Sequence, residues 1–121
     1  MKIIFKSLFI EIGNEIDELI KGGVIIFFGE NVPSTLKPYC IVHQVKIMNP
    51  LMIGDIIKIG NDSANITAIG EAANKNLLEL HHLVLKNNGF LKASLPGDIS
   101  VNGTFPNKVF AGEEMTILRE G

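Results

Sequence analysis

The chain has 121 residues, of which 46% are hydrophobic and 20% are charged, and its formal net charge is −2 at pH 7. This length suits one domain with its own core, so we expect residues 1–121 to form a single domain. The charges are balanced and do not run in blocks, which gives no indication of nucleic-acid binding. No stretch approaches the roughly 20 apolar residues of a membrane-spanning helix. The single cysteine, Cys40, excludes an internal disulfide and fits a cytoplasmic protein.

The N-terminal quarter of the chain predicts a strand, a helix and a second strand. Residues 3–12 are rich in Ile, Phe and Leu and predict a strand. Polar residues interrupt this apolar run, which disfavours the alternative of a signal peptide. Asn14 is typical of helix N-caps, and apolar residues at helical spacing predict an amphipathic helix over residues 14–21. Two glycines end this helix, and residues 24–28 predict a second buried strand.

A surface loop and a hairpin are predicted next. Residues 30–37 show no periodicity and predict a loop that leads into a strand at residues 38–44. Residues 55–59 and 64–69 predict two strands, and the Gly-Asn-Asp-Ser connection between them contains residues that tolerate positive φ. We therefore predict an antiparallel hairpin here.

The pattern after the hairpin predicts a short helix and another strand. Residues 71–78 are helix formers, and residues 79–86 read as a strand that ends at an Asn-Asn-Gly turn. Within this strand His81 and His82 would point to opposite faces of the sheet. We expect both histidines to be structural.

A glycine followed by an acidic residue precedes a β-prone run at three places, Gly54-Asp55, Gly97-Asp98 and Gly112-Glu113. The three places are unequally spaced, so we interpret them as a recurring turn rather than as an internal repeat. Glycine would supply backbone freedom and the acid would cap the turn. Many short strands with little helix predict an all-β, mainly antiparallel fold, a compact closed or nearly closed β-barrel with one or two short helices.

His43 is the candidate residue for chemistry. Side chains alternate along a strand, which places Tyr39, Ile41, His43 and Val45 on one face and Cys40, Val42, Gln44 and Lys46 on the other. The side chains of Cys40 and His43 thus point to opposite faces of the strand, so they cannot form a nucleophile–base pair or half of a metal site. If His43 is catalytic, its neutral imidazole can attack phosphorus or accept a proton. The alternative is that His43 is a structural histidine held by hydrogen bonds.

Four short blocks follow one another along the chain: Tyr39-Cys40-Ile41-Val42-His43, Ile66-Thr67-Ala68-Ile69-Gly70, Asn76-Leu77-Leu78-Glu79-Leu80, and Leu95-Pro96-Gly97-Asp98-Ile99 with Val101. In this order they resemble the glucitol/sorbitol-specific IIA component of the bacterial phosphoenolpyruvate-dependent sugar phosphotransferase system. The likeness covers nearly the whole chain, and the family's phosphorylated histidine falls on His43. His81-His82 stands where Gly-His is expected, so the family's second histidine falls on His82.

The resemblance implies a phosphoryl carrier that works through a phosphohistidine. His43 would accept a phosphoryl group from the histidine-containing phosphocarrier protein and pass it to a cysteine on the IIB part of a glucitol/sorbitol permease, whose IIC part spans the membrane. No cofactor other than this transient phosphoryl group and no metal is implied. We expect a cytoplasmic protein that does not insert into the membrane, with Gln44 and His82 as candidate supporting residues.

Two alternatives remain open from the residues themselves. The first is a non-catalytic β-barrel that binds a small molecule, in which His43 contacts the ligand or the core. The second is a thiol enzyme, disfavoured because burial in an apolar strand raises the pKa of a thiol. We expect Cys40 to be buried and dispensable and Tyr39 to serve packing. Because both partners are proteins, we expect a partly exposed His43 in a shallow apolar patch formed by Ile41 and Val42 with either Met48 or Leu51.

Overall fold

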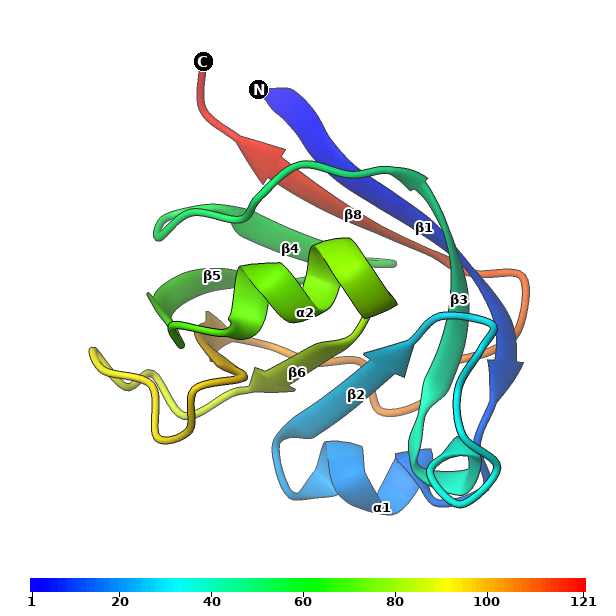
Figure 1. Ribbon diagram of the computed structural model, residues 1–121. Helices are drawn as coiled ribbons and strands as arrows, with labels where there is room; N and C mark the ends of the chain where they lie inside the picture. Colours follow the sequence, from blue (N-terminus) through cyan, green and yellow to red (C-terminus); the bar gives the residue numbers. More distant parts are fainter.

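The computed structural model describes residues 1–121 and consists mainly of strands (Figure 1). The strands are β1 (Lys2–Ile12), β2 (Val24–Phe28), β3 (Ile41–Ile47), β4 (Ile56–Ile59), β5 (Asp62–Ile69), β6 (Leu83–Lys86), β7 (Asp98–Gly103) and β8 (Glu114–Arg119). The helices are α1 (Ile16–Lys21) and α2 (Ala73–Leu80), and a short 3-10 helix, η1, spans Lys37–Tyr39. None of the helices is long and apolar enough to cross a membrane.

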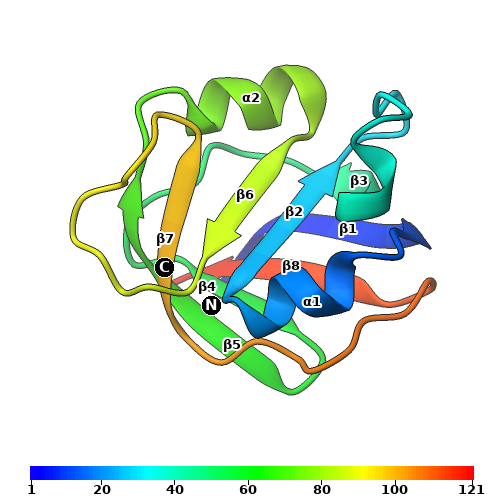
Figure 2. The same cartoon turned by 90° about the horizontal axis from the view of Figure 1, so that it is seen from below.

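The strands close into a barrel in the order β1-β3-β2-β6-β7-β5-β4-β8. The β2–β3 and β6–β7 pairs are parallel, and the other pairs are antiparallel. The two helices lie on either side of the β2–β6 pair (Figures 1 and 2). The prediction of a closed, mainly antiparallel β-barrel with two short helices is therefore confirmed.

The two halves of the chain have the same arrangement. Each half consists of a strand, a helix, a second strand, a long loop and two further strands. Exchanging β1 with β5, β2 with β6, β3 with β7 and β4 with β8 reproduces the same circular strand order. The barrel thus has an approximate internal twofold symmetry, in which the parallel β2–β3 pair corresponds to the parallel β6–β7 pair.

Equivalent hydrogen bonds support this symmetry. The amide of Gly13, before α1, donates to the carbonyl of Cys40 (2.9 Å), and the amide of Gly70, before α2, donates to that of Asp98 (2.8 Å). A Cβ atom at either glycine would collide with a backbone carbonyl of the loop that faces it. Glycine is therefore required at both places by the close approach of two backbone segments.

The turns with glycine and an acidic residue are capped as predicted. A carboxylate oxygen accepts the amide three residues before it in each turn: Asp55 from Met52 (2.7 Å), Asp98 from Leu95 (3.1 Å) and Glu113 from Phe110 (2.7 Å). However, the turns at Gly54 (φ 95°) and Gly112 (φ 93°) are symmetry equivalents. The interpretation as a recurring turn is confirmed, and two of the three turns in addition occupy equivalent places in the two halves, a relation that the unequal spacing of all three conceals.

Two predicted boundaries differ from the structure. The side chain of Asn14 does not cap α1, which begins at Ile16 after Glu15. The predicted strand over residues 79–86 is also wrong in its first half, because α2 continues to Leu80 and β6 begins only at Leu83. The strong helix formers of residues 77–80 extend α2 to Leu80, beyond the predicted end at residue 78.

The predicted strand over residues 38–44 begins later than expected. Pro38 and Tyr39 belong to η1, and β3 starts at Ile41. Tyr39 is 46% exposed, so its predicted packing role is wrong. Ile41 belongs to the core cluster and His43 lies beside the core rings of Phe5 and Phe27, whereas Val42, although also buried, is not part of that cluster, in agreement with the predicted alternation.

Candidate functional site

His43 lies inside the barrel, where it is surrounded by aromatic side chains. It has 0% exposed surface, and its ring centroid is 5.2 Å from that of Phe27 and 6.1 Å from that of Phe5. The prediction that His43 is partly exposed is therefore wrong. The expected apolar patch is absent as well, because Ile41 and Leu51 are themselves buried in the core.

Both ring nitrogens of His43 have a hydrogen-bond partner. Nε2 lies 2.7 Å from the carbonyl oxygen of His81, and Nδ1 lies 2.9 Å from Oγ of Ser7. A carbonyl oxygen only accepts, so Nε2 carries the proton and donates it to His81. In the neutral ring Nδ1 then accepts the hydroxyl proton of Ser7. The surroundings thus select one tautomer, with the proton on Nε2.

The surroundings also select the neutral form of the ring. Burial lowers the pKa of the His43 imidazole from 6.5 to about 4, although its hydrogen bond to the carbonyl of His81 opposes part of this shift. At pH 7 the ring is therefore uncharged and one of its nitrogens holds a lone pair. This is the form that attacks an electrophile.

Three elements position the site. Ser7 shares the inward face of β1 with Phe5 and Phe9, and β1 pairs with β3 so that Phe9 lies opposite His43. On the other side of β3, the pairing with β2 stops at Val42. The main chain of His81, the residue that caps the C-terminus of α2, lies against the imidazole through its carbonyl oxygen.

His81 has an unusual backbone conformation. Its φ is 56°, and it is the only residue other than glycine with a positive φ. In the other half of the barrel Gly23, with φ 81°, takes the same place between a helix and the next strand. A left-handed residue favours glycine because it has no Cβ atom. This accounts for the Gly-His pair expected at residues 81–82 from the family resemblance.

The second half of the barrel lacks the polar side chains of this site. By the register of the paired strands, the positions of Ser7 and His43 correspond to Ala64 and Val101. Both of these are buried members of the apolar core. The barrel can therefore be built with apolar residues at these positions, and the Ser7–His43 pair is an addition to one half.

The other residues selected from the sequence lie apart from the imidazole. Gln44 accepts a hydrogen bond from Lys46 (2.7 Å) and forms none with His43. His82 stacks on Phe28, with ring centroids 4.6 Å apart, and burial lowers its pKa. Ser7 and the main chain of His81 occupy the supporting positions instead. A serine on the inward face of an otherwise apolar strand was the signal in the sequence for Ser7.

Cys40 is buried, as predicted, with 1% exposed surface, and burial raises the pKa of its thiol. It precedes β3 and forms no part of the hydrogen-bonding around His43. The thiol is thus protonated near neutral pH and poorly reactive. This disfavours the thiol-enzyme alternative.

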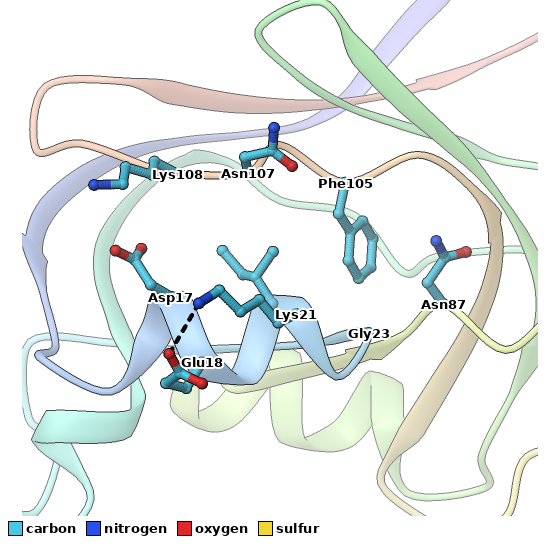
Figure 3. A pocket seen from close by; sticks show the side chains of 9 residues that line it. Asp17, Glu18, Lys21, Gly23, Asn87, Phe105, Asn107 and Lys108 are labelled. Atoms are coloured by element: carbon cyan, nitrogen blue, oxygen red, sulfur yellow. Dashed lines mark hydrogen bonds and ion pairs between the residues drawn. The ribbon is translucent and has the colours of Figure 1, made fainter.

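Two surface cavities occupy roughly equivalent places in the two halves. A cavity of about 240 Å³ borders His81, between the end of α2 and residues 28–33. A larger one of about 610 Å³ lies between α1 and residues 105–108, with Asp17, Lys21, Lys108 and Phe105 among its lining residues (Figure 3). Only the smaller cavity lies next to the histidine site.

Fold and site together define a class of protein, a closed β-barrel with a single histidine centre in one of two similar halves. The family model for the PTS system glucitol/sorbitol-specific IIA component matches residues 4–116. The chain therefore belongs to the family of glucitol/sorbitol-specific IIA components. As such it is a phosphotransfer protein of a sugar phosphotransferase system.

Individual relatives agree with this assignment. The glucitol/sorbitol-specific EIIA components of Shigella flexneri and Escherichia coli (strain K12) are each 29% identical over 113 residues, which cover 93% of this chain and 92% of the relative. The crystal structure of a PTS system IIA component from Enterococcus faecalis V583 matches with a TM-score of 0.75 and 24% identity. That match covers 91% of this chain and 96% of the other and concerns the fold.

Proposed function

We propose that this IIA component carries its phosphoryl group on His43, which it receives from the histidine-containing phosphocarrier protein. It then passes the group to a cysteine on the IIB part of a glucitol/sorbitol permease. The observation that carries the proposal is the hydrogen-bonded Ser7–His43 pair in a barrel whose other half has Ala64 and Val101 at the same positions. A buried polar pair that the architecture does not require suggests a role in function.

The transfer needs one nucleophilic nitrogen and no cofactor. We assign it to Nε2, because this side of the ring faces the main chain of His81 and the cavity beside it, whereas Nδ1 faces the buried Ser7. For this step the ring first exchanges its proton on Nε2 for one on Nδ1, so that Nε2 holds the lone pair. The Nε2 lone pair then forms the new N–P bond while the N–P bond of the donor phosphohistidine breaks, and the released electron pair returns to the donor imidazole.

The proposed partners and location follow from this role. Donor and acceptor are both proteins of the sugar phosphotransferase system, and the carrier works in the cytoplasm between them. The alternative of a barrel that holds a small molecule gains no support near His43, since 22 buried hydrophobic residues form a continuous core. The proposed function therefore rests on the reactivity of the imidazole rather than on an internal ligand site.

Labelling with phosphoenolpyruvate tests the proposal. The wild-type chain, incubated with labelled phosphoenolpyruvate and the general carrier proteins, should gain a label that survives alkali and is lost in acid. His43→Gln removes the nucleophile but keeps a polar side chain, and it should gain no label. His82→Gln is the matched control and should be labelled like the wild type. Label retained by a folded His43→Gln protein would refute the assignment.

A further inference from the structure

The proposed nucleophile is covered in this structure. His43 has no exposed surface, and Nε2 is held at 2.7 Å by the carbonyl of His81. An in-line attack needs the phosphorus atom to approach along the lone pair of the nitrogen. The main chain of residues 80–82, the α2–β6 junction, occupies that direction. Phosphoryl transfer to His43 therefore requires this junction to move.

The α2–β6 junction is held by the stacking of His82 on Phe28, by the hydrogen bond from His43 and by few backbone hydrogen bonds. The amide of His81 donates to Leu77 (2.9 Å), whereas the amide of His82 reaches Asn76 at 3.3 Å, and that of Gly29 reaches Leu80 at 3.3 Å. His81 also adopts a left-handed conformation that disfavours a residue with a side chain. A segment held by long hydrogen bonds and a strained residue is suited to local opening.

We infer that the α2–β6 junction is a cover that swings away from the barrel to expose Nε2 of His43, and that Ser7 is the positioning residue that holds the ring once the cover has left. This inference rests on the proposed function. The cavity beside His81, bordered by Gly29, Pro33 and Leu80, gives the junction space on its outer side. Leu80 is 48% exposed, so its displacement does not break open the core.

Ser7 becomes important because the proton on the ring must change place. With the cover open and the ring solvated, Nδ1 takes up a proton from the solvent, and the transient imidazolium releases its Nε2 proton to water, which restores the neutral charge. The hydroxyl of Ser7 then turns from donor to acceptor, a change that a serine makes without moving its oxygen. After attack, the proton at Nδ1 stays on the phosphorylated, positively charged ring, and Ser7 Oγ stabilises it.

A disulfide across the cover tests the movement. A Cβ atom placed on Gly29 would lie 3.3 Å from the Cβ of His81, close to the spacing of about 3.5–4.5 Å in disulfides. The variant Gly29→Cys/His81→Cys, with Cys40→Ser to prevent exchange, should lock the junction when oxidised. The reduced form of the same protein is the matched control.

Two phosphoryl donors are compared, the phosphorylated carrier protein and the small molecule phosphoramidate. The oxidised protein should lose acceptance from both donors by at least tenfold, and reduction should restore it. Equal rates of phosphoryl acceptance in the oxidised and reduced proteins would refute the inference that the junction must move. Loss of acceptance from the carrier protein alone would also refute it, because the disulfide would then impair only the docking of the carrier. If the reduced variant and the wild type gain no phosphohistidine from the carrier, the proposed function fails instead.

Variants of Ser7 test its positioning role. Ser7→Ala should slow phosphoryl acceptance about tenfold and lower the pKa of the phosphorylated ring in a ³¹P NMR titration, because Nδ1–H loses its acceptor. Ser7→Thr should restore both values. Ser100→Ala removes another fully buried hydroxyl, one without a hydrogen-bond partner, and should change neither. An unchanged phosphohistidine pKa in Ser7→Ala would overturn the role of Ser7.

Discussion

Protonation of His43 should destabilise the folded protein in mild acid. Burial lowers the pKa of this imidazole from 6.5 to about 4. Between these two values the unfolded chain binds a proton that the folded chain does not, so the free energy of unfolding falls as the pH falls. Above pH 6.5 both states are neutral and the effect vanishes.

The expected loss is large on the scale of the stability of a small domain. One pKa unit corresponds to about 1.4 kcal/mol, so a ring with these two pKa values destabilises the fold by about 2 kcal/mol at pH 5 and by about 3 kcal/mol at pH 4. Small domains are stable by only about 5–15 kcal/mol. His43 alone therefore accounts for a substantial part of the acid sensitivity.

Urea denaturation of the wild type and His43→Gln at several pH values between 7.5 and 4.5 measures this contribution. All other titrating groups, including His82 with its lowered pKa, are present in both proteins and cancel in the difference. The stability of the wild type relative to the variant should fall by about 2 kcal/mol between pH 7.5 and 5. A difference that stays constant over this range would refute the burial of a neutral His43.

Three further predictions concern stability and transfer together. Cys40→Ser should keep phosphoryl acceptance in the labelling assay and lose about 1–3 kcal/mol in urea denaturation, because a hydroxyl replaces a buried thiol. Gly70→Ala should lower the free energy of unfolding by about 1–3 kcal/mol through a collision with the facing backbone, whereas Gly22→Ala, with ordinary space around its Cβ atom, should be close to neutral. Ser7→Ala/His43→Val copies the other half of the barrel and should abolish acceptance while keeping stability at pH 7 within about 1 kcal/mol of the wild type; severe unfolding would show that the polar pair is structural.

Local chemistry explains which parts of the fold could be predicted. The acids of the three glycine turns cap amides three residues away, and the hairpin of β4 and β5 closes over the two residues Gly60 and Asn61, within the four-residue connection that the sequence predicts, so short stretches of sequence determine both. The parallel pairing of β2 with β3 and of β6 with β7 depends on residues far apart in the chain. The twofold relation between the halves was missed because the two halves share geometry more than residue identity.

The site shows the same division between local and distant causes. Alternation along β3 predicts that His43 points inward with Ile41, and this is what the structure shows. Whether an inward histidine is covered depends on His81, which comes from a segment that reads as a strand but ends as a helix cap. The hydrogen-bond partner of Nδ1 lies in β1, 36 positions earlier in the chain. No pattern within β3 could reveal either partner.

Comparing the two symmetric halves shows which features the barrel itself requires. Both halves place a residue with positive φ after their helix, but one uses Gly23 and the other uses His81. Apolar Val101 fills the core at the position where His43 carries a depressed pKa and two hydrogen bonds. The second half thus accepts backbone strain at His81 that Gly23 avoids, and the first half accepts a buried polar pair, Ser7 and His43, where the second half is apolar. Stability alone does not account for either feature, whereas the proposed function does, because both serve a nucleophile that is kept neutral and covered between two transfers.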